Sequence, residues 1–306
     1  MHTIHNVAIL GAGAMGATFA AKFFDAGFAT SLLATGERLA RLQAGGLIVN
    51  GKQYAIPAID PAQAQAPADL ILVALKHHHM AQALAGLGAL VGENTLFISV
   101  MNGLESEERI GALYGMDKVL YAISLGIDAV RDGNCVNYTR AGVHYFGEAR
   151  NDTPSPRVLA VQAAFERAGI QYQIPKDMLR MLWWKFMFNV GINQASAVTR
   201  APYGVFQTRP EAQALMESLM REVLALAQAA QIDLREQDLL DWYPVLNRLS
   251  PLGKTSMLQD VEAGRKTEVE LFAGRVVALG EQYGIATPVN QAVLRIIQIL
   301  ERGAGG

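Results

Sequence analysis

A glycine-rich turn near the start of the chain constrains the fold more than any other feature. The apolar run Val7–Leu10 leads directly into it, and an alanine- and phenylalanine-rich segment follows as far as Gly27. The turn consists of Gly11, Ala12, Gly13, Ala14, Met15 and Gly16. In this G-x-G-x-x-G spacing the first glycine permits the turn, the second lets the backbone approach a pyrophosphate, and the third allows close helix-to-strand packing. Glycine-rich turns are common, but one placed between a strand and a helix predicts an α/β dinucleotide-binding fold whose helix start receives the phosphate charge.

The end of the second expected strand bears on which dinucleotide binds. The strand Thr30–Leu33 is followed by Ala34 and Thr35, and Arg38 lies one short turn further on. An acidic side chain at this strand end usually holds the ribose 2′-hydroxyl of NAD, whereas an arginine nearby accommodates the 2′-phosphate of NADP. The strand end carries no carboxylate, so the sequence favours NADPH. The alternative is that Arg38 is simply a surface residue of the following helix.

Two further strands look buried, which predicts a parallel sheet covered on both faces. The first, residues 68–75, ends at Lys76, and the second, residues 95–100, runs into Asn102 and Gly103. Asn102 therefore lies at the carboxyl end of a strand, where ligands of open α/β sheets bind, although Asn-Gly is also a common turn pair. The three histidines at 77–79 would point in different directions at a helix start, so we expect no metal site there.

The character of the chain changes after Pro175. Before it we expect strands at 118–127, 135–139 and 143–148 that extend the sheet in antiparallel fashion, a helix at 156–168 and a strand at 171–174. After it the strand-like alternation ends, and we expect helices at 177–199, 209–231, 236–246, 256–283 and 289–302. These patterns predict a Rossmann-type domain over residues 1–174 and an all-α domain over residues 175–306.

A stripe of polar residues crosses the first of these helices. Lys185, Asn189 and Asn193 follow one another at i, i+4 and i+8, so one amine and two amides share a face. Their neighbours are apolar, including Phe186 and Ile192, so we expect a buried helix whose stripe faces a cavity. Apolar surroundings disfavour a charged lysine and lower its pKa towards neutrality, which is the profile of a general acid. The alternative is an amphipathic helix with a solvated polar edge.

A second polar group lies in the expected helix 256–283. On a continuous helix Ser256 and Asp260 share a face, and Glu268 lies within about a third of a turn of that face three turns later. A carboxylate there could meet Lys185. The alternative is that Glu268 belongs to a solvated charged face with its basic and acidic neighbours.

The composition excludes several classes of protein. The 306 residues contain 26 Lys and Arg against 28 Asp and Glu, for a formal net charge of -2. This balance does not indicate a basic surface for nucleic-acid binding. The single Cys135 excludes an internal disulfide framework and a cysteine-rich zinc site, and it fits a reducing, cytoplasmic compartment. The apolar run Val7–Phe24 lacks the basic residues that precede a signal-peptide core, and no other window approaches the length of a membrane span.

Several separated motifs, in order, resemble those of the ketopantoate reductases (2-dehydropantoate 2-reductases) over essentially the whole chain. They are the glycine-rich turn, Leu75-Lys76, Asn102-Gly103, Trp184-Lys185 with Asn189 and Asn193, and the segment from Ser256 to Glu268. The resemblance implies a Rossmann domain joined to an all-helical domain, NADPH as cofactor, and reduction of a small 2-oxo acid.

The resemblance also implies roles for individual residues. In that family the lysine that corresponds to Lys185 is the general acid, and the glutamate that corresponds to Glu268 helps to hold the substrate and the lysine. The substrate and catalytic cleft of the family contains the residues that correspond to Asn102, Asn189, Asn193 and Ser256. The lysine that corresponds to Lys76 lies near the nicotinamide. No metal is expected, and the apolar helical half is compatible with a homodimer.

The chain departs from this family pattern at three positions. Members usually have an arginine that grips the NADP 2′-phosphate where this chain has Thr35, so either Arg38 substitutes for it or discrimination is relaxed. Gly253 and Tyr203 stand where some members have substrate-side asparagines. Three functions therefore remain open: ketopantoate reduction in pantothenate and coenzyme A synthesis, reduction of another 2-oxo acid, and a non-catalytic NADPH sensor. The sensor is disfavoured because a binding module has no need of a proton donor.

Overall fold

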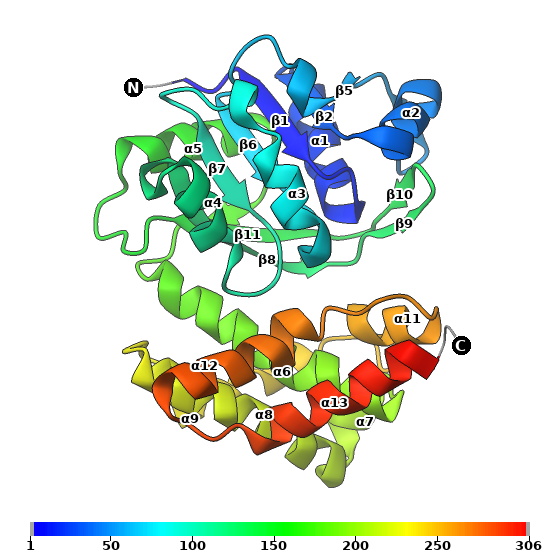
Figure 1. Cartoon of the computed structure of the whole chain (residues 1–306), viewed down its shortest axis with the longest axis vertical. Helices are drawn as coiled ribbons and strands as arrows, with labels where there is room; N and C mark the ends of the chain where they lie inside the picture. The colour runs from blue at the N-terminus through cyan, green and yellow to red at the C-terminus, as the bar shows by residue number, and fades with distance from the viewer. Residues whose placement is uncertain (1–2, 304–306) are drawn as a thin grey trace. The chain divides into compact units, whose positions relative to one another are not determined.

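A computed structural model describes residues 3–303 and divides the chain into two compact units, Met1–Leu179 and Arg180–Gly306 (Figure 1). This division falls within the first turn of helix α6 (Met178–Thr199), a few residues after the boundary that the sequence predicts. Within residues 3–303 no helix combines the length and the apolar character that crossing a membrane requires.

The first unit is built on an eight-stranded sheet with the order β12-β11-β8-β7-β6-β1-β2-β5. Its strands are β1 (Asn6–Leu10), β2 (Ala29–Leu33), β5 (Ala58–Ile59), β6 (Leu70–Val73), β7 (Leu96–Ser99), β8 (Val119–Ile127), β11 (Ala141–Gly147) and β12 (Tyr172–Gln173). Six neighbouring strands of this sheet, β5, β2, β1, β6, β7 and β8, are parallel. Numbered 1 to 6 in chain order, they have the 3-2-1-4-5-6 arrangement of a Rossmann fold. The predicted α/β fold class is confirmed.

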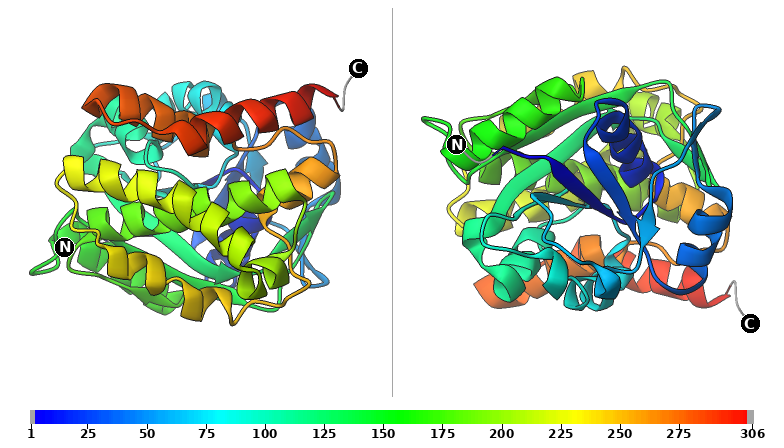
Figure 2. Two further views of the ribbon diagram at one scale, coloured as in Figure 1. Left: turned by 90° about the horizontal axis from the view of Figure 1, so that it is seen from below. Right: turned by 90° about the horizontal axis from the view of Figure 1, so that it is seen from above.

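Helices cover both faces of this sheet (Figure 2). They are α1 (Ala14–Asp25), α2 (Gly36–Gly45), α3 (Met80–Ala85), α4 (Ser106–Tyr114) and α5 (Pro156–Arg167), with short 3-10 turns η1 (Pro61–Gln63), η2 (His77–His79), η3 (Gly88–Leu90) and η4 (Met116–Lys118). Alternate residues of β1 face opposite ways: Ile9 packs into a cluster with α1 and α5, whereas Leu10 packs into a cluster with α3 and α4. This alternation explains why the parallel strands are apolar throughout.

A second, four-stranded sheet was not expected from the sequence. It has the order β4-β3-β10-β9, with β3 (Leu47–Val49), β4 (Lys52–Tyr54), β9 (Val130–Asp132) and β10 (Cys135–Asn137). The prediction that residues 118–148 extend the main sheet antiparallel is wrong for two of its three strands, because β8 pairs parallel with β7 and β10 leaves the main sheet to pair with β3. Only β11 runs antiparallel, against β8.

The second unit is all-helical, as predicted. Besides α6 it contains α7 (Tyr203–Thr208), α8 (Pro210–Ala229), α9 (Glu236–Leu240), α10 (Tyr243–Leu246), α11 (Ser256–Glu262), the π-helix η5 (Glu270–Gly274), α12 (Arg275–Tyr283) and α13 (Pro288–Gly303). Close packing of α6 on α8 depends on Gly191, where an added Cβ would lie 2.5 Å from a side-chain carbon of Met220. A buried hydrogen bond of 2.9 Å from Gln194 to Asn290 joins α6 to α13.

Two of the predicted helices are interrupted. The predicted helix 236–246 is split into α9 and α10, and Pro244, in the first turn of α10, has no N–H with which to continue the α9 hydrogen-bond ladder. The prediction of one helix over residues 256–283 is also wrong. Helix α11 ends at Glu262, and Gly264 adopts a left-handed φ of +62°. A side chain–side chain bond from Arg265 to Asp260 holds the turn at the end of α11.

Candidate active site

The glycine-rich turn has a steric reason for its outer glycines. Gly11 has a φ of +103°, and an added Cβ would lie 2.5 Å from the carbonyl oxygen of Ala74. At Gly16 an added Cβ would lie 1.9 Å from the carbonyl oxygen of Gly11, so this glycine lets α1 pack against the strand end. Both positions exclude a side chain for reasons internal to the fold.

The middle glycine is open by comparison. A Cβ at Gly13 would meet its nearest neighbour, the Ala74 carbonyl oxygen, only at 3.8 Å. Gly13 is also the N-cap of α1, and the first intrahelical bond runs from Ala17 N to Gly13 O. The amides of residues 14–16 precede that bond and are the ones that a helix start offers to an anion. The turn therefore fits a dinucleotide pyrophosphate, with room at Gly13 for its close approach.

Three loops of the predicted site meet at the carboxyl edge of the parallel strands. Residue Leu10 of β1 pairs with Val73 of β6, and Val73 pairs with Ser99 of β7. The glycine-rich turn, the loop with Lys76 and the loop with Asn102 follow these three paired residues directly. The strand order reverses between β1 and β6, so these loops lie at the switch point where open α/β sheets bind ligands.

Arg38 is tied to the glycine-rich turn. Its guanidinium donates to the carbonyl oxygen of Ala12 at 2.7 Å and to Oδ1 of Asn134 at 2.7 Å. Burial lowers the pKa of Arg38 to about 10, and the positive charges of Arg131 and Arg41 add to this effect. Arg38 is thus a half-buried residue of α2 that is bonded to the glycine-rich turn, and its role in cofactor binding stays a prediction. Thr35, the exposed N-cap of α2, makes no side-chain cap bond.

The basic surroundings of Arg38 could not have been found from the sequence. Asn134 donates a second bond, from Nδ2 to the carbonyl oxygen of Arg41 at 2.9 Å, and so holds the β9–β10 turn against α2. Arg131 lies on β9, more than 90 residues after Arg38 in the chain. Within residues 3–303 no ion pair joins Arg38, Arg41 or Arg131 to a carboxylate. Arg38 and Arg41 are neighbours on α2, but no local sequence pattern predicts that Arg131 joins them, because Arg131 comes from β9 of the second sheet.

The amine–amide stripe of α6 is buried. Lys185, Asn189 and Asn193 are 8%, 8% and 7% exposed, within a helix whose residues 182–197 are buried except for the half-buried Trp184. The amide of Asn193 donates to Oδ1 of Asn189 at 3.1 Å, which fixes the two side chains relative to each other. The expected burial of the helix is confirmed, and a solvated polar edge is excluded by these exposures.

Ser256 and Asp260 lie four residues apart on α11, as predicted, but Glu268 lies beyond the end of that helix and does not share its face. Ser256, the first residue of α11, is exposed, and Thr255 caps this helix by accepting a bond from Leu258 N at 3.1 Å. Glu268 is half-buried and lies in the segment between the end of α11 at Glu262 and the start of η5 at Glu270. Glu268 does not keep the predicted orientation because the regular rotation per residue ends where helix α11 ends.

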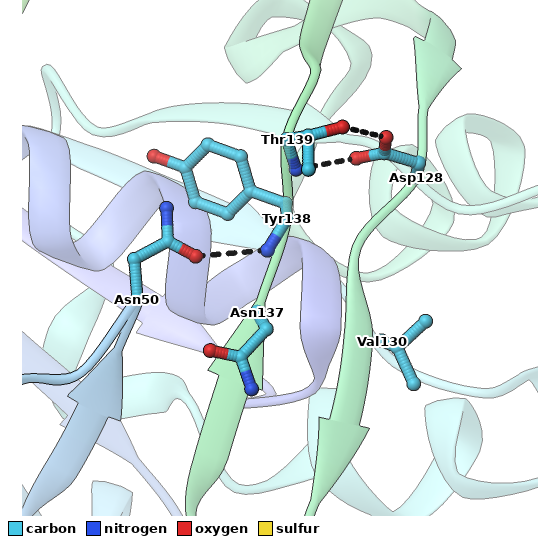
Figure 3. A pocket seen from close by; sticks show the side chains of 6 residues that line it. All are labelled: Asn50, Asp128, Val130, Asn137, Tyr138 and Thr139. Carbon is cyan, nitrogen blue, oxygen red and sulfur yellow. Dashed lines mark hydrogen bonds between the residues drawn. The ribbon is translucent and has the colours of Figure 1, made fainter.

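Two surface hollows of the first unit are not lined by predicted site residues. A surface hollow of about 480 Å³ is lined by Asn50, Asp128, Val130, Asn137, Tyr138 and Thr139, and none of these is a predicted site residue (Figure 3). His77–His79 form the turn η2, and within residues 3–303 no group of three or more His, Cys, Asp or Glu side chains is placed to hold a metal ion.

Comparison with known proteins identifies the family. Residues 7–151 match the family model described as "Ketopantoate reductase PanE/ApbA", and residues 177–301 match "Ketopantoate reductase PanE/ApbA C terminal". The chain is 24% identical over 301 residues to the 2-dehydropantoate 2-reductase of Aquifex aeolicus, covering 96% of each chain.

Solved structures share the fold over nearly their whole length. A PanE/ApbA family ketopantoate reductase from Ralstonia eutropha superposes with a TM-score of 0.87 at 24% identity, covering 98% of this chain and 99% of that one. D-mandelate dehydrogenase, in a ternary structure with NADH and anilino(oxo)acetate, superposes with a TM-score of 0.89 at 19% identity and the same coverage. Because the two family models together cover most of the sequence, the chain belongs to the ketopantoate reductase family of oxidoreductases.

Proposed function

We propose that this protein is a 2-dehydropantoate 2-reductase, which reduces ketopantoate to pantoate with NADPH in pantothenate and coenzyme A synthesis, in the cytoplasm. The observation that carries the proposal is the buried stripe of Lys185, Asn189 and Asn193. A buried amine beside two fixed amides suits the delivery of a proton to a carbonyl oxygen. The active unit is a monomer or a homodimer.

Each residue of the site has a role in the proposed reaction. The nicotinamide, when bound, supplies a hydride to the C2 carbonyl of the 2-oxo acid. Lys185 donates a proton to the carbonyl oxygen, where negative charge grows only as the reaction proceeds, so its contribution is larger in the transition state than in the ground state. The Asn193-to-Asn189 bond uses the oxygen of Asn189, so Asn189 offers its NH₂ group to a substrate oxygen.

The remaining predicted residues bind the two ligands. Glu268 and Ser256 contact the substrate or orient Lys185, and Asn102 contacts the substrate. Lys76 lies near the nicotinamide, and residues 11–16 hold the pyrophosphate. Several of these roles rest on the family resemblance. For the pyrophosphate site, the open space at Gly13 adds a steric argument.

NADPH is favoured over NADH by the charges around Arg38. A 2′-phosphate carries negative charge that guanidinium groups bind through charge-assisted hydrogen bonds. Arg38, with Arg131 and Arg41 in electrostatic contact, supplies positive charge beside the turn that receives the pyrophosphate. This basic cluster takes the place of the family arginine that is missing at Thr35.

One observation favours a second candidate, a reductase of a different 2-oxo acid. An added Cβ at Gly253 would lie 3.0 Å from the ring of Tyr203, and the Tyr203 N–H donates to the Gly253 carbonyl at 3.0 Å. An aromatic ring therefore packs on a glycine where some family members have two substrate-side asparagines. An apolar contact in place of two amides favours a less polar substrate than ketopantoate.

The test is the loss of NADPH absorbance on adding ketopantoate to the purified protein, beside NADH and a panel of aliphatic and aromatic 2-oxo acids. Rapid, saturable oxidation with ketopantoate supports the first candidate. Preference for another acid supports the second. Tight NADPH binding without turnover on any acid would contradict both and leave the sensor hypothesis.

A further inference from the structure

The segment that carries Glu268 is held in place from a distant part of the chain. It lies between the end of α11 at Glu262 and the start of η5 at Glu270. Its first half is tied to α11, because Arg265 N donates to the Asp260 carbonyl at 2.8 Å and Arg265 Nε donates to Asp260 Oδ1 at 2.9 Å. The second half, next to Glu268, needs a different anchor.

That anchor is Glu301 in the last turn of α13. One carboxylate oxygen, Oε1, accepts from the Thr267 N–H at 2.8 Å and from the Thr267 hydroxyl at 2.5 Å. Thr267 is only 3% exposed. A carboxylate near a helix C-terminus is disfavoured by the helix dipole, and the two charge-assisted bonds to Thr267 offset this cost.

Thr267 also orders the turn that contains Glu268. Its hydroxyl oxygen accepts from Val269 N at 3.2 Å, which closes an ST-turn just before η5 and its N-cap Val269. The Leu271 and Phe272 amides then donate to the Glu268 carbonyl at 2.9 and 3.2 Å. Because the hydroxyl donates to Glu301 and accepts from Val269, its orientation is determined on both sides. The backbone of Glu268 is thereby fixed by its two neighbours.

From these contacts we infer that Glu301 is a positioning residue, which acts through Thr267 to set the place of the Glu268 carboxylate in the active site. The inference rests on the proposed function, in which Glu268 holds substrate and orients Lys185. Positioning matters for catalysis because a displacement of about 1 Å in an active site costs up to about 100-fold in rate.

The test is a set of variants assayed for KM, kcat and NADPH affinity with the preferred 2-oxo acid. Glu301→Ala is expected to raise KM about tenfold and to lower kcat, with NADPH affinity unchanged. Glu301→Gln is expected to stay within about twofold of wild type, because an amide oxygen still accepts both bonds. Gln298→Ala is the matched control: it deletes a 2.7 Å bond from the same helix to Glu270 without touching Thr267, and it should change neither constant.

A double variant separates positioning from general stability. If Glu301 acts through Glu268, then Glu268→Ala combined with Glu301→Ala loses no more activity than Glu268→Ala alone. Additive losses would overturn the inference. Should Glu301→Ala fail to fold, Thr267→Val against Thr267→Ser makes the same comparison from the other side of the contact.

The outcomes also distinguish this inference from the proposed function. Normal kinetics in Glu301→Ala, with Glu268→Ala impaired, would overturn the positioning role and leave the proposed function standing. Normal kinetics in Glu268→Ala itself would remove the role of Glu268 from the proposed function and the inference with it.

Discussion

At the scale of single residues, the proposed chemistry depends on one buried amine. Lys185 has an exposed fraction of 8%, and its i+4 and i+8 neighbours are amides rather than apolar groups. Burial alone would favour an apolar side chain here. The proton donation proposed above accounts for a buried lysine at this place.

We predict that Lys185→Ala lowers kcat by about 10²- to 10⁴-fold, because proton donation in the transition state is lost. NADPH affinity should stay the same. Steady-state kinetics and a fluorescence titration with NADPH measure the two quantities. Lys176→Ala, an exposed lysine in the preceding segment, is the control, and near-normal turnover in Lys185→Ala would contradict the assigned role.

The glycines of the N-terminal turn are predicted to behave differently when each is changed to alanine. Gly16→Ala should destabilise the protein by about 1–3 kcal/mol, because its Cβ would overlap the Gly11 carbonyl and the backbone must shift. Gly13→Ala should leave the unfolding free energy nearly unchanged but weaken NADPH binding. Urea unfolding and NADPH titration of both variants test this. Equal stability losses would show that Gly13 also serves packing.

At the scale of helices and strands, Glu222 of α8 caps the start of α13. Its two oxygens accept from Val289 N at 2.8 Å and from Asn290 N at 3.0 Å, and one of them also accepts from the Asn290 side chain at 2.7 Å. These are first-turn amides, which a helix leaves without an internal acceptor. The contact joins the helix that carries Glu301 to the core of its unit.

Glu222→Gln is expected to lower the free energy of unfolding by about 2 kcal/mol, because one of the two acceptor oxygens is replaced by a donor. Urea unfolding at neutral pH measures the loss. The control is Glu281→Gln on the exposed surface of α12, which should change little. A loss of the same size in both variants would rule out a specific cap.

The turn after β8 makes a pH-dependent contribution to the free energy of unfolding. Burial alone would raise the pKa of Asp128, but bonds from Thr139 and Arg140 outweigh it and lower the pKa to about 2 from 3.8. The carboxylate accepts from Thr139 N at 2.9 Å and from Thr139 Oγ1 at 2.5 Å (Figure 3). It also accepts from Arg140 N at 2.8 Å. A lowered folded-state pKa adds stability above the unfolded-state pKa, and that stability is lost as the pH falls towards 2.

Asp128→Asn should therefore cost about 1 kcal/mol of stability at pH 7, after allowance for solvent screening at this partly exposed site. The difference from wild type should hold down to about pH 4.5 and shrink at lower pH. Denaturant unfolding across this range measures it. A difference that does not depend on pH would mean that shape, not charge, explains the loss.

At the scale of the whole molecule, ligand binding should stabilise the chain by mass action. NADPH at 100 times its dissociation constant adds about 2.7 kcal/mol to the unfolding free energy of the part that binds it. A contribution from the 2′-phosphate would appear as a larger rise in unfolding temperature with NADPH than with NADH at equal concentration.

Arg131→Ala is predicted to reduce the NADPH-induced rise in unfolding temperature while leaving the NADH-induced rise unchanged, because only NADPH carries the 2′-phosphate. Thermal unfolding with each cofactor measures both. Arg140→Ala removes one positive charge from the same unit, outside the Arg38 cluster, and serves as the control. Equal loss with NADPH and NADH would contradict a phosphate-specific role for Arg131.

The sequence by itself determined what depends on local spacing. The strand, turn and helix around residues 6–25, the buried helix α6 and the all-helical second half follow from patterns within a few residues, and the structure confirms them. The stripe of Lys185, Asn189 and Asn193 also follows from the period of one helix. In each case the residues that carry the signal are neighbours on a single element, so no distant contact is needed to predict it.

The tertiary structure decided what depends on contacts between distant residues. The second sheet, which brings Arg131 and Asn134 to Arg38, pairs Ile48 of β3 with Cys135 of β10, which lie 87 residues apart in the chain. No periodicity in the sequence predicts such a pairing. The sequence does not predict the break after Glu262, because a single glycine such as Gly264 is tolerated within a helical pattern. The contact that holds the chain beyond the break comes from α13, where Glu301 accepts two hydrogen bonds from Thr267 ahead of η5.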